Sequence, residues 1–255
     1  NYYAPLFGDI FTENGEVPLV LSNYYDNLLI ENYTDDWLSD RDNSDITIEY
    51  GDQFFITFLK ITSGSYKLWV QPTNEDGTFG TAVSGALTMS GQFNLFNFQA
   101  AAINAWAGSE IITQNTYGYN VYISLGAATT RVLRFRQVCN PKYRQYNLHF
   151  LNRLGGYDSM AFRLVNKRRS EFQRSSYRRN PYQLSNGQMT NIDAYNKYNE
   201  TTYNFAIQHT DYYMLTSDWI NDQDYAWLAQ LVASPIVYME VQGAFFPVTI
   251  RNTNY

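Results

Sequence analysis

The chain has 255 residues, of which 45% are hydrophobic, so it is long and apolar enough to bury a sizeable core in one large or two ordinary domains. No apolar run approaches the roughly 20 residues of a membrane-spanning helix, and we therefore expect no membrane partner. The single cysteine, Cys139, excludes an internal disulfide and any Cys-x-x-Cys zinc or redox motif. We expect it to be a small, buried apolar residue at the end of a strand.

The net charge of −6 hides a division between the two halves of the chain. Residues 1–130 hold 15 acidic and 3 basic side chains, whereas residues 131–255 hold 9 acidic and 15 basic ones. The basic excess is concentrated in residues 131–181, and Pro141 interrupts the pattern near the start of that stretch. We therefore predict two domains, an acidic one over 1–139 and a second one over 140–255.

Short segments of alternating polar and apolar residues predict strands in the acidic domain at Ile46–Tyr50, Gln53–Thr62, Tyr66–Gln71, Thr116–Leu125 and Arg131–Val138. Strands of this length and spacing are typical of an Ig-like β-sandwich. The exception is Phe98–Ala107, whose alanines favour a short helix that Gly108 can end. Residues 1–45 are rich in Asn, Asp and Tyr, and we expect an N-terminal arm that reaches a neighbouring subunit.

The second domain is predicted to be β-rich and to begin with a hairpin. Apolar residues alternate with polar ones from Tyr146 to Phe150 and again from Met160 to Leu164, the period of half-buried strands. The glycines at 155–156 supply the turn between them. In this pattern His149 is an outward-facing residue.

The principal helix of this domain is predicted near residues 221–233. Asn221 can act as the N-cap, and Asp224 stands at the acidic position of a capping box. Pro235 ends the helix. The apolar stripe expected to face the core consists of Tyr225, Leu228, Leu231 and Val232.

Two further strands are predicted after this helix, at Ile236–Val241 and Phe245–Ile250. Pro247 lies within the second of them and has no backbone donor. We therefore expect that strand to lie at a sheet edge or to carry a bulge.

The last third of the chain resembles a C-terminal module of virion and tail proteins from phages of Bacteroidetes hosts, including crAss-like phages. The resemblance is carried by three segments in a fixed order, LHFLNRLGGYDSMAFRL (148–164), SDWINDQDYAWLAQLVASPIVYMEV (217–241) and FFPVTIRNTNY (245–255). It implies a structural subunit of a virion, in a ring, collar or muzzle type assembly of the tail. It also implies assembly in the bacterial host cytoplasm, with copies of the chain and other virion proteins as partners. The motifs are not catalytic, so no active site is implied.

A dense basic run, KRRSEFQRSSYRR (167–179), includes the candidate subunit-interface residues Arg168, Arg169, Arg174, Tyr177, Arg178 and Arg179. Three interpretations are open for it. Its arginines and aromatic rings suit a nucleic acid, its charge suits the acidic half of a neighbouring protein, and an ordinary solvated hairpin would look the same. The negative net charge of the chain disfavours a nucleic-acid partner. We adopt the protein-interface interpretation.

The sequence predicts no enzyme, cofactor or metal site. Its two histidines, His149 and His209, stand in no nucleophile or metal-ligand motif. The segment Asp40–Asp45 has the alternating carboxylates of a calcium loop, but it lacks the glycine and glutamate that an EF-hand requires, so we expect a solvated loop. The alternative function is a receptor-binding or glycan-binding module, which an exposed Trp37, Trp69 or Trp106 beside Asp or Asn would favour.

Overall fold

The computed structural model of the 255-residue chain describes residues 35–41, 45–89, 91–138, 142–180, 182–191, 202–217 and 220–251. The predicted mainly β fold is confirmed, because strands dominate and helices are few in this part of the chain. Two compact units are formed, one by residues 1–165 with 216–255 and the other by residues 166–215. The predicted boundary between residues 139 and 140 falls within the first unit. None of the helices in the described ranges is long and apolar enough to cross a membrane.

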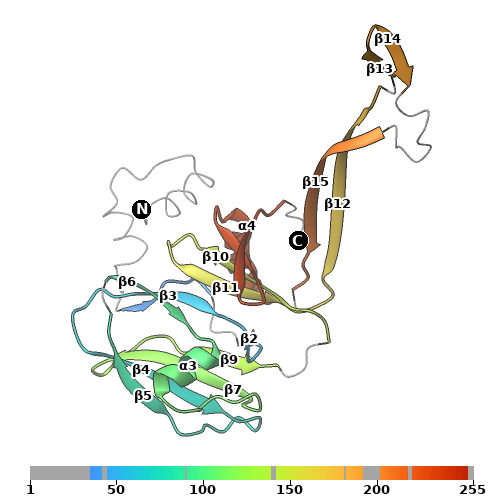
Figure 1. Ribbon diagram of the computed structural model, residues 1–255. Coiled ribbons are helices and arrows are strands. Elements are labelled where there is room, and N and C mark those ends of the chain that lie inside the picture. Colours follow the sequence, from blue (N-terminus) through green and yellow to red (C-terminus); the bar gives the residue numbers. More distant parts are fainter. Residues whose placement is uncertain are drawn as a thin grey trace. The chain divides into compact units, whose positions relative to one another are not determined.

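The first unit contains two sheets that share a core (Figure 1). The six-stranded sheet has the order β2 (Ile46–Ile48), β9 (Leu133–Gln137), β7 (Gly118–Leu125), β4 (Tyr66–Thr73) and β5 (Val83–Leu87), with the short β8 (Ala128–Thr129) paired to β7. The three-stranded sheet has the order β1 (Asp36–Trp37), β3 (Phe55–Leu59) and β6 (Phe93–Asn97). The predicted strands of the acidic domain are confirmed, whereas the Ig-like topology stays a prediction.

The core between these sheets is built from aromatic rings. Trp37 is fully buried and meets Phe58 and Phe98 edge-on, with ring centroids 5.6 and 5.4 Å apart. Tyr119 stacks on Phe135 at 4.8 Å and donates its hydroxyl proton to the carbonyl oxygen of Phe98. A buried tyrosine thus fills the core with its ring while its polar end is satisfied, which accounts for part of the high tyrosine content.

The predicted short helix is confirmed as α3 (Ala100–Ala107). Gly108 ends it in the left-handed conformation at φ 67°, which a residue without a Cβ adopts without steric cost. Trp106 packs against the backbone of Gly85 in β5, and a Cβ at position 85 would lie 2.9 Å from the indole. Glycine at this position therefore lets the helix approach the sheet closely.

A four-stranded sheet in the same unit has the order β11 (Tyr157–Phe162), β10 (Tyr146–Leu151), β16 (Val237–Val241) and β17 (Ala244–Val248). The predicted β10–β11 hairpin is confirmed. Its turn needs Gly156, since a Cβ there would lie 2.6 Å from the carbonyl oxygen of Leu38. β17 lies at the edge of the sheet, as Pro247 predicted.

The principal helix is confirmed as α4 (Asp222–Ala233), which the side chain of Asn221 caps by accepting a hydrogen bond from the Asp224 amide at 2.6 Å. The predicted core-facing stripe is partly wrong. Leu231 is buried, but Tyr225 is 47% exposed, and the residue that faces the core instead is Trp227, which is 2% exposed. Trp227 also donates its indole N–H to a buried acceptor, Asp158, at 2.7 Å.

The second unit consists of two antiparallel pairs (Figure 1). A long ribbon is formed by β12 (Lys167–Arg178) and β15 (Thr202–Met214), and a short hairpin is formed by β13 (Tyr182–Ser185) and β14 (Gln188–Asn191). In the ribbon, the register shifts between Ser175 and Ser176, which marks a bulge.

Candidate functional site

The ribbon β12–β15 holds every predicted interface residue except Arg179, which follows β12 directly. Every residue of β12 is exposed. Three large apolar side chains of the ribbon are also exposed, at 58% for Phe172, 68% for Phe205 and 60% for Ile207. A two-stranded ribbon has no second layer of its own to cover such groups, so they are available to another surface.

The apolar and aromatic side chains occupy both faces of the ribbon. Directly opposed residues of an antiparallel pair share a face, and Phe172 is opposite His209, with the two rings stacked at 4.4 Å. Ile207, two residues along β15, lies on the same face. Beyond the bulge and on the other face, the ring of Tyr177 stacks on that of Tyr203 at 5.9 Å and lies 6.3 Å from that of Phe205. We call Phe172, Tyr177, Phe205, Ile207 and His209 the aromatic stripe.

Part of the positive charge of the ribbon is neutralised within the ribbon itself. Arg168 pairs with Asp211 at 2.7 Å, and Arg169 pairs with Glu171 at 2.8 Å. Hydrogen bonds from Arg168, and then from Ser170, lower the pKa of the Asp211 carboxyl to about 2. Exposed pairs of this kind are worth little stability, but they reduce the charge that a partner would meet.

The remaining arginines of the candidate set are placed differently. Arg174 and Arg178 are exposed and form no ion pair with the side chains that the structure describes. Arg179 donates to the hydroxyl of Tyr203 at 3.4 Å, beside the Tyr177 ring. The structure thus brings Tyr177 and Arg179 together around Tyr203, and it leaves Arg174 and Arg178 as the cations best able to meet an external carboxylate.

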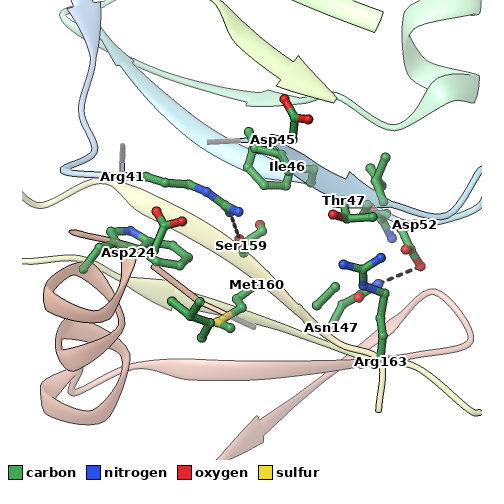
Figure 2. Close-up of a pocket in the computed structure, with 16 residues that line it drawn as sticks. Arg41, Asp45, Ile46, Thr47, Asp52, Asn147, Ser159, Met160, Arg163 and Asp224 are labelled. Atoms are coloured by element: carbon green, nitrogen blue, oxygen red, sulfur yellow. Dashed lines mark hydrogen bonds between the residues drawn. The ribbon is translucent and has the colours of Figure 1, made fainter. Parts of the chain in front are cut away.

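A separate cavity of about 100 Å³ lies in the first unit, among β2, β11 and the start of α4 (Figure 2). Arg41 extends into it, donates to the carbonyl oxygen of Ser159 at 3.4 Å and lies 4.7 Å from the centre of the Trp227 ring system. Arg163 lies at the other end of the cavity in Figure 2, near Asp52. Burial lowers the pKa of Arg41, whereas the nearby carboxylates Asp224 and Asp158 raise it.

The lining of this cavity is close to neutral. Its charged residues are Arg41, Arg163, Asp45, Asp52 and Asp224. The two cations and three carboxylates largely compensate one another. The cavity therefore attracts neither an anion nor a cation strongly. The space is large enough for a few water molecules. The cavity is therefore a small space inside the unit with a mixed polar and charged lining.

Asp158 does not line this cavity but contacts the lining residue Trp227, and it is 2% exposed. Its Oδ2 accepts hydrogen bonds from Trp227 Nε1 at 2.7 Å, Ser39 Oγ at 2.9 Å and Asn152 Nδ2 at 3.1 Å. Burial raises the pKa of Asp158, and the three hydrogen bonds oppose that effect. One carboxyl therefore joins the segment after β1, the β10–β11 hairpin and α4.

His149 is buried, so the prediction of an outward-facing histidine is wrong. The strand β10 is covered on both sides, by Trp227 against Phe150 at 5.5 Å and by Phe55 against His149 at 5.1 Å. Alternation marks the face of a side chain, but it does not say whether the second face is solvated. That face is covered here because β3 lies against β11.

The buried histidine forms a constellation that resembles a catalytic triad in composition. His149 Nδ1 lies 2.8 Å from Ser159 Oγ, and its Nε2 lies 3.3 Å from Glu240 Oε2. However, Ser159 Oγ also accepts from the Phe55 amide at 2.8 Å and donates to the Phe55 carbonyl oxygen at 3.1 Å. The Ser159 hydroxyl therefore bonds to the β3 backbone as well as to the imidazole, so the arrangement crosslinks β11 to β3.

The predicted calcium-like segment is only partly described, because residues 42–44 lie outside the described ranges. Asp40 accepts hydrogen bonds from Arg153 Nε at 2.6 Å and from Gln230 Nε2 at 2.8 Å, so its carboxylate serves the hairpin and α4. Within the described ranges, no group of three or more His, Cys, Asp or Glu side chains could hold a metal ion. Cys139 and residues 1–34 of the predicted N-terminal arm also lie outside those ranges.

The three tryptophans that would favour glycan binding differ in their burial and in what they contact. Trp37 belongs to the core, and Trp106 packs on Gly85. Trp69 lies half-buried on the six-stranded sheet, where its ring is stacked with that of Tyr122.

No protein-family model matches the sequence, and no curated protein matches it.

Proposed function

We propose that the chain is a non-enzymatic structural subunit of a bacteriophage virion, in the tail, and that the ribbon β12–β15 is the arm through which it contacts neighbouring subunits. The phage assignment is supported by the three segments in residues 148–255, and the contact role is supported by the aromatic stripe. The observation that carries the proposal is the exposure of Phe172, Phe205 and Ile207 on a ribbon of only two strands.

The energetics favour a covered ribbon. Isolated two-stranded hairpins are at best marginally stable in water, whereas a ribbon packed on another surface gains the burial of its apolar groups. Fully burying each of these three side chains contributes about 1.5–3 kcal/mol. Aromatic residues and arginine also dominate the energetically important positions of protein interfaces. The stripe and its neighbouring arginines have this composition.

Charge supports a second copy of the chain, or another acidic virion protein, as the partner. Twelve of the 24 acidic residues of the sequence lie within residues 1–52. Some are used inside the first unit, as Asp36 is by Arg131 at 3.1 Å. In a head-to-tail ring, unlike surfaces of neighbouring copies meet, so Arg174 and Arg178, which form no ion pair with a described side chain, would face the remaining carboxylates.

The test compares the oligomeric state of two variants with that of the wild type. The stripe variant carries Phe172→Ser, Phe205→Ser and Ile207→Ser, and the control carries Gln173→Ser and Gln208→Ser, a directly opposed pair between the stripe positions of each strand. Sedimentation velocity over a wide range of concentrations should show a concentration-dependent assembly for the wild type and for the control, and a loss of assembly for the stripe variant. A wild type that stays monomeric at all concentrations, or a stripe variant that assembles normally, would overturn the contact role.

A further inference from the structure

We infer that the outer face of the six-stranded sheet is a binding platform for an acidic oligosaccharide, centred on Trp69 of β4 and Tyr122 of β7. This inference concerns the first unit alone and does not rest on the proposed function. We call the outward-facing residues of β4, β5, β7 and β9 the outer face.

The central pair belongs to the outer face by register. Trp69 and Tyr122 are directly opposed in the β4–β7 pair. Their neighbours on both strands, Leu68 and Val70 on β4 and Val121 on β7, are buried in the core. Because side chains alternate between the two faces of a sheet, the two rings lie on the side away from the core. They are not needed to fill it.

The two rings are stacked in parallel, which fixes their orientation. Their planes differ by 3° and their centroids lie 5.9 Å apart. Trp69 Nε1 donates to Ser124 Oγ at 2.9 Å, which fixes the direction of the indole. The flat C–H face of a pyranose ring packs well on such an aromatic surface, whose π-face is the negative side of the ring quadrupole.

Amide and hydroxyl groups border the rings. Gln71 of β4 and Asn120 of β7 are directly opposed, one outward position along from the aromatic pair. Ser84 of β5 is opposite Trp69 on the other side and is exposed. Amides and hydroxyls both donate and accept hydrogen bonds, which is the chemistry that sugar hydroxyls require.

The charge of the outer face is positive although the chain is acidic. Lys67, Arg134 and Arg136 are exposed, and register places all three outward, with Arg134 opposite Asn120 and Arg136 opposite Gly118. Strands β4, β5, β7 and β9 contain no Asp or Glu. On β7, Lys67 is opposite Ser124 and Arg136 is opposite Gly118. These positions are six residue steps apart, or roughly 20 Å, which is long enough for several sugar units. Carboxylated sugars therefore fit better than neutral ones.

A single-stranded nucleic acid is the competing ligand, since bases also stack on aromatic rings above basic residues. It carries a phosphate at every residue, and the net charge of −6 opposes so dense a polyanion. An oligosaccharide with less closely spaced carboxylates suffers less from that repulsion, so we assign the face to the glycan.

The experiment measures binding by isothermal titration calorimetry with three probes: an acidic hexamer (a hyaluronan hexasaccharide, which carries a carboxylate on every second sugar), a neutral maltohexaose and a 12-residue oligothymidylate. We expect the wild type to bind the acidic hexamer. Its affinity for maltohexaose should be at least tenfold weaker. Trp69→Ala and Tyr122→Ala should each weaken the acidic hexamer at least tenfold. Phe79→Ala, which removes an exposed aromatic ring outside these four strands, should leave its affinity unchanged.

A second variant keeps the test independent of folding defects. Lys67→Ser with Arg134→Ser alters only exposed side chains, and it should weaken the acidic hexamer while thermal melting stays unchanged. The platform is refuted if the wild type does not bind the acidic hexamer, or if Trp69→Ala binds it with wild-type affinity. Binding of oligothymidylate in place of the hexamer, with the same sensitivity to Trp69, would also overturn the glycan assignment. Repeating the titration with the ribbon stripe variant separates this result from any failure of assembly.

Discussion

Trp227 of α4 donates its indole N–H to the carboxyl group of Asp158 in β11 at 2.7 Å, and both residues are buried. The bond accompanies the contact of the Trp227 ring with Phe150 of β10 at 5.5 Å, so Trp227, and not Tyr225, is the aromatic residue that the helix buries.

Replacing Trp227 by Phe should test this bond, because the variant keeps most of the ring but removes the donor. We expect the free energy of unfolding to fall by about 1–3 kcal/mol, since a buried acceptor loses a partner. Urea denaturation followed by circular dichroism measures it. Tyr225→Phe, in the same helix but at an exposed position, is the control and should stay within about 0.5 kcal/mol of the wild type. Equal stability of both variants would show that the bond is unimportant.

The ionisation of Asp158 should make stability depend on pH. Burial raises the pKa of Asp158 in the folded protein. The stability that its protonated form contributes is fully present below the unfolded pKa of about 3.9 and is lost as pH rises through the folded pKa. Compared with Asp158→Asn, the wild type should therefore lose stability as pH rises above about 4.

Asp76→Asn provides the control of opposite sign for this pH series. Hydrogen bonds from the Thr78 side chain and amide lower the pKa of Asp76, so the wild type should gain stability relative to this variant as pH rises. Denaturation at a series of pH values gives both comparisons. Parallel pH profiles for wild type and Asp158→Asn would contradict the expectation for the buried carboxyl.

The two leucines of α4 should differ in importance. Leu231 is 3% exposed, and Leu231→Ala should cost about 2–5 kcal/mol through lost transfer energy and a cavity. Leu228 is only half-buried, so Leu228→Ala should cost less than Leu231→Ala. Chemical denaturation of both variants gives the order. If Leu228→Ala were the more damaging, the helix would be rotated from the orientation described.

The charges of the ribbon should act mainly on the rate of association. Arg174→Glu with Arg178→Glu removes cations that are unpaired within the described part of the chain, and we expect assembly to slow roughly tenfold or more at low salt. Arg168→Glu with Arg169→Glu should slow it less, because both arginines are already paired with Asp211 and Glu171. Stopped-flow light scattering at two salt concentrations measures both. Equal rates for wild type and the first variant would exclude electrostatic steering by these residues.

We predict that the protein has no hydrolytic activity of its own. Incubation with host capsular polysaccharides and peptidoglycan should release no product. Ser159→Ala should instead lower the free energy of unfolding, by about 1–3 kcal/mol, because the Phe55 amide loses its buried acceptor. Turnover by the wild type that disappears in Ser159→Ala would show that the histidine constellation is catalytic after all.

Local signals in the sequence predicted the elements well. Asn221 and Gly108 mark helix ends through backbone chemistry that is confined to a few residues, and Pro247 marks an edge strand for the same reason. The six candidate interface residues were likewise placed by a local feature, the density of basic charge, and five of the six lie in β12.

What the sequence could not predict depends on contacts between distant segments. His149 alternates like an outward residue, and only the packing of β3 against β11 buries it. Trp227 and Asp158 are 69 residues apart, and no local pattern links them. The platform at Trp69 and Tyr122 required the pairing of β4 with β7, which periodicity does not specify.

Pro247 in β17 has a consequence for how copies of the chain can associate. A proline offers no backbone N–H, so an additional strand laid along this edge would find a gap in the ladder. Continuous growth of the four-stranded sheet from one copy into the next is therefore disfavoured. An additional copy that met this edge would have to use side-chain contacts in place of a continuous backbone ladder, so the proline protects this strand from unlimited edge-to-edge aggregation.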